Sequence, residues 1–241
     1  MITNSPSTLS ERWKRLVVAD RSYIEARMRL FDSLHADGLL LDEKSYSYPR
    51  QNELVMVFFK RLPDTFLDSF AEREFESKSR ALYQEFVLRQ EELSAALEAV
   101  LPTGSELLNL LKIALSDPSE RATALRFTNF LRRYNDVLTN EDNFEQIFSE
   151  LLYIASSYSG FTDLAREIIL SLSREWLLAN IEKYSEGILE DGTYEEYSGL
   201  IKLYSEIDPS LAFKLARRAA DSADEDIREI GEMYLVEYQN R

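Results

Sequence analysis

Helix-start signals recur at short intervals from Ser105 to the C-terminus, and they limit the fold more than any other feature of the sequence. Asp117 and Asp208 each precede a Pro-Ser pair, which places an aspartate at the N-cap and a proline at the first helical position. Asp224 marks a third start. Apolar residues recur at three- and four-residue spacing after each start, and the connections between the resulting helices are short. Short connections favour antiparallel neighbours, so the sequence predicts an all-α fold with more than about 60% helix.

The N-terminal part carries longer helical patterns, over 9–34 and 64–101, with a shorter buried helix that contains the apolar run 54–59 and ends at Pro63. Asp20 interrupts the apolar stripe of the first helix, and we expect it at the edge of the buried face. Pro102-Thr103-Gly104 then ends the helical pattern.

We therefore expect two domains: a helical bundle with two long helices over 1–101, and an antiparallel helical-repeat (α-solenoid-like) array over 105–241. The helices predicted for the array span 106–116, 118–138, 141–158, 162–186, 194–206, 209–222 and 225–239.

Glycine and proline are scarce, with 7 and 6 among 241 residues. Most glycines, including Gly187 and Gly192, fall where a helix is expected to end. Gly199 and Gly231 instead lie inside helical patterns, where glycine costs about 1 kcal/mol relative to alanine. We expect these two positions to permit a close approach of neighbouring helices.

The segment Asp117–Arg126, which reads D-P-S-E-R-A-T-A-L-R, resembles the second helix of a HEAT repeat, and Asp224–Leu235 resembles a weaker copy. Leu200–Tyr204 and the following Ala212 and Ala216 are similar to the helix pairs of TPR-type repeats, although the tryptophan-to-proline signature of that family is absent. The resemblance implies stacked antiparallel helices and assigns no activity.

Most catalytic chemistries lack the residues they need. The chain has no cysteine, which excludes disulfides, thiol catalysis and cysteine-ligated metals. His35 is the only histidine; Asp32 shares its helical face, but a metal site of the Glu-x-x-His type needs further ligands. No glycine-rich phosphate-binding motif is present. We therefore predict no cofactor, no metal and no enzymatic activity.

The net charge is −15, with 15 basic and 20 acidic residues in 1–120 and 13 basic and 23 acidic in 121–241. Such a field repels phosphate backbones and anionic lipids, so direct binding to nucleic acid or membrane is disfavoured. Basic clusters such as Lys214 with Arg217-Arg218 are expected to be solvated or paired within the chain. The first residues lack a secretory signal, and the longest apolar run, 54–59, is far shorter than the roughly 20 residues of a membrane span. We expect a soluble cytoplasmic protein.

These observations predict a non-enzymatic protein–protein interaction module, such as an adaptor, scaffold or regulatory subunit, that presents a tyrosine-rich acidic face to a partner protein with a basic surface. Between Glu182 and Glu206 seven acids accompany only Lys183 and Lys202, and this excess is expected to be exposed and not neutralised within the chain. The predicted contact residues are Glu190, Asp191, Tyr194, Glu195, Glu196, Tyr197 and Tyr204.

Two other functions remain open on the sequence alone. The first is an acidic inhibitor that occupies the site of a basic nucleic-acid-binding protein. The second is a metal-dependent helical enzyme that uses only carboxylates, for example with Mg²⁺.

Overall fold

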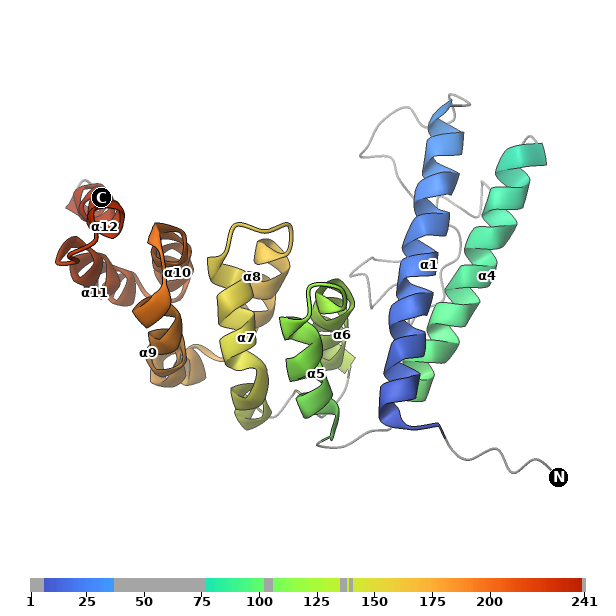
Figure 1. The fold of residues 1–241 in the computed structure, drawn as a ribbon, viewed down its shortest axis with the longest axis horizontal. Coiled ribbons are helices and arrows are strands. Elements are labelled where there is room, and N and C mark those ends of the chain that lie inside the picture. The colour runs from blue at the N-terminus through green and yellow to red at the C-terminus, as the bar shows by residue number, and fades with distance from the viewer. Residues whose placement is uncertain (1–6, 37–76, 102–105, 135–137, 139–140, 240–241) are drawn as a thin grey trace. The chain divides into compact units, whose positions relative to one another are not determined.

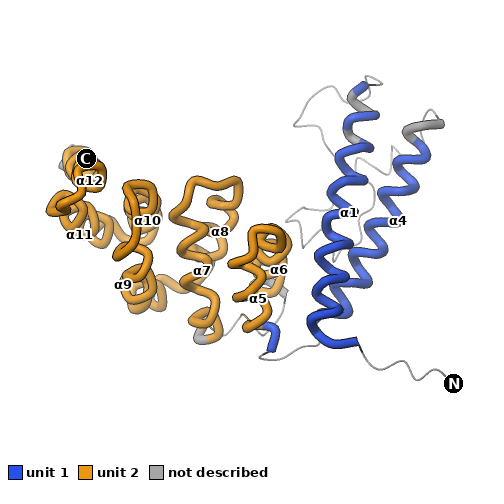
Figure 2. Tube along the Cα trace, viewed as in Figure 1, with its two compact units in different colours: residues 1–107 blue, residues 108–241 orange. Residues whose placement is uncertain are grey.

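A computed structural model of the chain describes residues 7–36, 77–101, 106–134, 138 and 141–239 (Figure 1). Within these ranges all regular secondary structure is helical and no strand occurs, which confirms the all-α prediction. The chain forms two compact units that divide between Leu107 and Leu108 (Figure 2). The buried helix predicted from Leu54 to Pro63 and the first part of the helix predicted over 64–101 lie outside the described residues.

Unit 1 contains two long helices, α1 (Leu9–Ala36) and α4 (Ser77–Val100), that pack side by side. They run antiparallel, because Arg12 near the start of α1 donates to the carbonyl of Ala99 (2.7 Å), whereas Arg29 near its end pairs with Glu85 (2.8 Å). The core between the helices holds fully buried side chains of Leu16, Tyr23, Phe86, Leu93 and Leu97.

Asp20 departs from the expectation for α1. Its side chain is 0% exposed, so it lies within the buried face of the helix and not at the edge of that face. Apolar spacing alone identifies the stripe of α1 but does not show how far the neighbouring helix covers it. The side chain of His35 lies outside the described residues.

Unit 2 is built from consecutive short helices, and most of them contact the next one along the chain (Figure 1). α7 packs on α8, α10 packs on α9 and α11, and α11 packs on α12. Contacts between α7 and α10 join the earlier helices to the later ones. In order, the elements are α5 (Glu106–Ser116), α6 (Arg121–Tyr134), a 3₁₀ turn η3 (Glu141–Phe144), α7 (Glu145–Ser156), α8 (Thr162–Leu170), α9 (Arg174–Asp191), α10 (Tyr194–Ile207), α11 (Pro209–Ala220) and α12 (Glu225–Gln239). The first two residues of α5, Glu106 and Leu107, belong to unit 1.

The predicted starts at Asp208 and Asp224 are N-caps in the structure. The Asp208 carboxylate accepts from the backbone N–H of Ser210 at 2.8 Å, and the Asp224 carboxylate accepts from Ile227 at 3.1 Å. Asp117 makes the corresponding bond to Ser119 at 2.7 Å, but residues 118–120 form a turn and α6 begins only afterwards.

The single helix predicted over 162–186 is wrong, because two helices occupy this part of the chain. The break lies at 171–173, where the Ser173 hydroxyl accepts from the backbone N–H of Trp176 and caps α9. α9 then continues through Gly187, which was expected to end a helix, as far as Asp191. The low helix propensity of Gly187 is therefore outweighed by the packing of α9. Ser185 and Leu189, two residues before and after Gly187, are both buried.

Gly199 and Gly231 lie where helices touch, which confirms the expectation for both. A Cβ atom at Gly199 would stand 2.0 Å from the backbone oxygen of Ser156 in α7, and one at Gly231 would stand 2.2 Å from the backbone nitrogen of Ala220 in α11. No other residue fits these positions without moving a backbone. The two contacts fix α10 against α7 and α12 against α11.

Candidate protein-binding surface

The start of α10 organises the predicted contact residues. Thr193 is the N-cap, and Glu196 completes a capping box, since its carboxylate accepts from the backbone N–H of Thr193 at 2.9 Å and from its hydroxyl at 2.6 Å. Burial by itself would raise the pKa of the Glu196 carboxyl, but these hydrogen bonds outweigh it and lower the pKa. Glu196 is therefore occupied in holding the helix start and offers little to a partner.

Tyr197 and Tyr204 are buried, with 6% and 2% of their surface exposed. The Tyr197 hydroxyl donates to the carbonyl of Leu189 (3.3 Å), and the Tyr204 hydroxyl lies 2.5 Å from the hydroxyl of Ser185. Both tyrosines thus hold α10 against α9, and burial raises the pKa of Tyr204 to about 12. This packing removes the two residues from the contact surface that the sequence predicted, because helical spacing does not distinguish an outward tyrosine from one that joins two helices.

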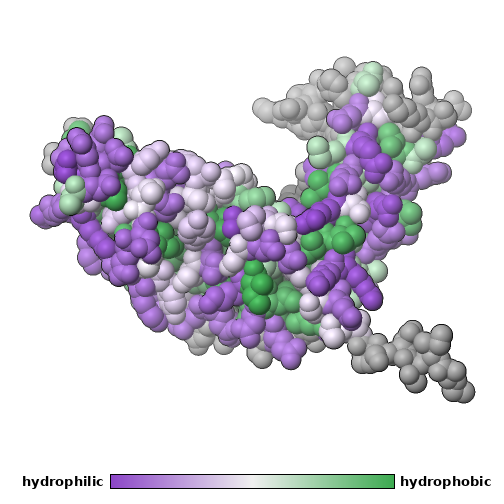
Figure 3. All heavy atoms as spheres, viewed as in Figure 1, coloured by the Kyte–Doolittle hydropathy of each residue, from purple (hydrophilic) through white to green (hydrophobic). Residues whose placement is uncertain are grey.

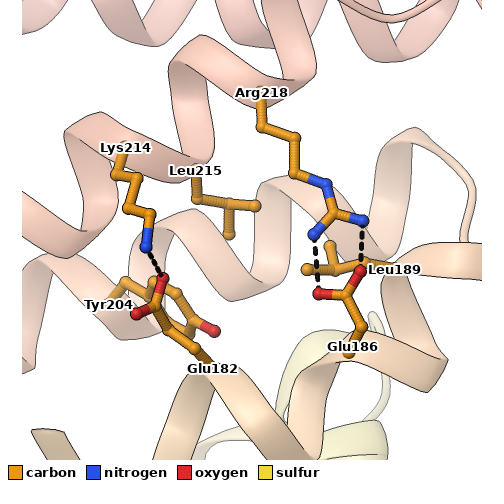
Figure 4. A pocket seen from close by; sticks show the side chains of 7 residues that line it. All are labelled: Glu182, Glu186, Leu189, Tyr204, Lys214, Leu215 and Arg218. Atoms are coloured by element: carbon orange, nitrogen blue, oxygen red, sulfur yellow. Dashed lines mark hydrogen bonds and ion pairs between the residues drawn. The ribbon is translucent and has the colours of Figure 1, made fainter.

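Two acids of the series between Glu182 and Glu206 are neutralised by α11. Lys214 donates to Glu182 at 2.6 Å, and both guanidinium nitrogens of Arg218 donate to the Glu186 carboxylate at 2.7 Å (Figure 4). The hydrogen bonds from Arg218 lower the pKa of Glu186. The expectation that this acidic excess is not neutralised within the chain is therefore wrong for both residues. Lys214 and Arg218 form pairs within the chain, which is one of the two alternatives expected for this basic cluster.

These α9–α11 ion pairs flank a cavity of about 310 Å³ whose apolar lining comes from Leu189, Tyr204 and Leu215 (Figure 4). Every charged side chain that lines the cavity already has a partner of opposite sign. A charged ligand would have to displace those partners. The cavity is therefore a poor candidate for an ion-binding site.

The remaining predicted residues are accessible. Glu190 and Asp191 are exposed at the end of α9. Tyr194 is 44% exposed, and its hydroxyl donates to Glu195 at 3.3 Å. The negative charge of Glu195, followed by this hydrogen bond and the charge of Asp226, raises the pKa of Tyr194. Tyr194 thus stands in a local field that favours cations.

Tyr158, in the α7–α8 connection, lies beside α10, because its hydroxyl is 3.3 Å from the hydroxyl of Ser198. Its ring is 63% exposed, and the ammonium group of Lys202 stands 5.3 Å from the ring centroid and 3.2 Å from the hydroxyl. Hydrogen bonds with Ser198 and Lys202 lower the pKa of Tyr158. We use the name tyrosine–acid surface for Tyr158, Tyr194, Glu195 and Asp226.

Three separate parts of the chain build the tyrosine–acid surface: the α7–α8 connection, the first turn of α10 and the first turn of α12. Sequence reasoning found Tyr194 and Glu195 because they adjoin a helix start. It did not join Asp226 to them, because no local signal shows that α12 packs on α10.

Comparisons with protein-family models, with curated proteins and with solved structures give no match for this chain. None of the described helices combines the length and the apolarity that a membrane crossing requires. The described residues also contain no group of three or more histidine, aspartate or glutamate side chains placed to hold a metal ion.

Proposed function

We propose that this chain is a non-enzymatic protein-interaction module, an adaptor, scaffold or regulatory subunit, that binds a basic segment of a partner protein at the tyrosine–acid surface. The observation that carries the proposal is the contact of Lys202 with Tyr158. An ammonium group over an exposed tyrosine ring is the arrangement that a partner's lysine or arginine would make with Tyr194, whose hydroxyl already donates to the Glu195 carboxylate.

The arrangement of unit 2 supports a HEAT- or TPR-like array as the scaffold for this surface. α7 packs on α8, and the helices from α9 to α12 each pack on the next, with connections of one to five residues. Glycines lie at two of the helix crossings. Arrays of this kind bring side chains from different repeats onto one extended face. The tyrosine–acid surface has that character, because the α7–α8 connection, α10 and α12 all contribute to it.

The alternative of an acidic inhibitor of a nucleic-acid-binding protein receives less support. A duplex mimic needs a regular row of unneutralised carboxylates, and Glu182 and Glu186 are paired with Lys214 and Arg218. No observation on the described residues favours a carboxylate-only enzyme.

The first experiment tests the aromatic contact by affinity capture with the full chain. Wild-type protein, the double variant Tyr158→Ala/Tyr194→Ala and the control Tyr153→Ala are used as baits in parallel. Tyr153 is a matched control because it is 48% exposed in the same unit. A true partner is enriched by wild type and by Tyr153→Ala and is lost with the double variant. Equal capture by all three baits would remove the tyrosine–acid surface from the proposal.

The second experiment tests charge next to the tyrosine–acid surface with the partner so identified. Glu190 and Asp191 are exposed at the end of α9, and Asp191 lies three residues before Tyr194 in the chain. Glu190→Lys/Asp191→Lys should slow association at low salt by about tenfold or more and leave the fold intact, since cations are favoured at the C-terminal end of α9. The matched control is Glu91→Lys/Glu98→Lys, which changes the net charge equally on exposed positions of α4. Association rates that are the same for both charge variants across a salt series would contradict a local role for Glu190 and Asp191.

A further inference from the structure

Unit 1 carries a groove whose charge is opposite to that of the chain as a whole. The groove has a volume of about 610 Å³ and runs between α1 and α4. Its lining includes Arg12, Lys14 and Arg15 from α1 and Arg89 from α4, against one carboxylate, Glu92. Lys14 and Arg15 are exposed and form no ion pair with another described residue. We call this site the basic groove.

The rest of the lining is apolar and small. Val18 is 63% exposed, and Ala95, Ala96 and Ala99 supply the α4 side. Small side chains allow the backbone of an incoming helix to approach closely, and an exposed valine gains by being covered. The ligand that suits both features is an amphipathic helix with a short apolar stripe between carboxylates. A phosphate backbone would satisfy the cations but would leave the apolar floor uncovered.

The outward face of α12 has this chemistry. Met233 and Val236 are 51% and 58% exposed, and they lie on one side of the helix together with exposed Glu229 and Glu232. Positions 229, 232, 233 and 236 follow the three- and four-residue spacing of a single helical face, which is opposite to the buried Ile227 and Tyr234. Figure 3 shows a largely hydrophilic face over α11 and α12 with small hydrophobic patches.

We propose that the basic groove binds α12 of a second copy of this chain, so that copies associate head to tail. The occupant is chosen by complementarity: two apolar side chains of α12 cover Val18 and the alanines, while Glu229 and Glu232 meet Lys14 and Arg15. The groove and the helix face are different surfaces, so the contact is heterologous and can propagate to rings or open chains. None of these residues belongs to the tyrosine–acid surface, so the inference is independent of the proposed function.

Sedimentation velocity of the full chain tests self-association at low salt, over about 10 to 500 μM, the range expected for a contact the size of one helix face. Wild-type protein should associate with rising concentration, and about 0.5 M salt should weaken the association because exposed charges are screened. Lys14→Glu/Arg15→Glu and Glu229→Lys/Glu232→Lys should each raise the dissociation constant about tenfold or more, since each places like charges across the contact.

Mixing the two variants gives the decisive measurement. The acidic groove of one variant then faces the basic helix of the other, so association should return to within a few-fold of wild type. A wild-type protein that stays monomeric over the whole range would overturn the proposal, as would charge variants that associate normally or a mixture that does not associate. Circular dichroism of each variant establishes that the fold is retained.

A second experiment tests whether nucleic acid, and not α12, binds in the basic groove. A labelled DNA duplex is titrated with wild type and with Lys14→Glu/Arg15→Glu, and binding is followed by fluorescence polarisation. No binding by wild type is the result expected here. Binding that the variant loses would assign the basic groove to phosphate backbones and overturn the α12 assignment.

Discussion

Gly199 and Gly187 are both helical, yet their surroundings are opposite. Gly199 meets the backbone of Ser156, whereas a Cβ atom at Gly187 would have no neighbour within 4 Å. The first position therefore requires glycine for packing. Gly187 has the conformational cost of glycine in a helix, but no neighbouring group lies so close that a side chain could not fit there.

Alanine at each position should consequently have opposite effects. Gly199→Ala forces two backbones apart and should lower the free energy of unfolding by about 3 kcal/mol or more. Gly187→Ala should raise it by about 0.5–1 kcal/mol, through helix propensity and a less flexible unfolded chain. Urea unfolding followed by circular dichroism measures both changes. A Gly199→Ala variant as stable as wild type would contradict the close contact between α7 and α10.

At the scale of elements, the hydroxyls of Tyr204 and Ser185 join α10 to α9 in a buried site. Burial raises the pKa of Tyr204 from 10.0 to about 12, so the folded state keeps its proton at a pH where the unfolded state has lost it. The stability linked to this group is complete below pH 10, and it falls as pH rises from about 10 to about 12.

Tyr204→Phe should make this dependence visible. Near pH 8 the variant should be about 1 kcal/mol less stable than wild type because the hydrogen bond is lost. By pH 11 the free energy of unfolding of wild type should have fallen by about 1 kcal/mol because of Tyr204, whereas phenylalanine does not titrate. The difference in stability between the two proteins should therefore nearly vanish. Urea unfolding of both proteins at the two pH values measures it, and the other tyrosines cancel in the comparison. A difference that stays constant would show that Tyr204 does not titrate with folding.

Features of the elements differ in how well the sequence predicts them. The cap at Asp208 and the glycine at Gly199 could be predicted because the cause lies within a few residues, or in the absence of a side chain. The partners of Glu182 and Glu186 could not, since Lys214 and Arg218 follow 32 residues later and only packing brings them close. The same limit applies to the site: Tyr194 and Glu195 are local to one helix start, whereas the burial of Tyr204 and the nearness of Asp226 depend on tertiary structure.

At the scale of the whole molecule, the chain forms two compact units, and each contains fully buried leucines, such as Leu93 in unit 1 and Leu152 in unit 2. We predict two calorimetric transitions, one for each unit. Leu93→Ala and Leu152→Ala should each destabilise one unit by about 2–5 kcal/mol and lower one transition only, since both leucines are fully buried. Two variants that shift the whole unfolding profile together would contradict independent units.

The two ion pairs between α9 and α11 also restrict how this part of the chain can change in length. Both span 32 residues, and the stretch between them is helix apart from Gly192, Thr193 and Asp208. An inserted or deleted residue in α10 would turn everything after it by about 100° and move it by about 1.5 Å. Connections of one or two residues are too short to compensate for this shift. Glu182 and Glu186 would then no longer face Lys214 and Arg218 on α11. Natural length variation in unit 2 is therefore expected in the α7–α8 and α11–α12 connections, and not between Glu182 and Arg218.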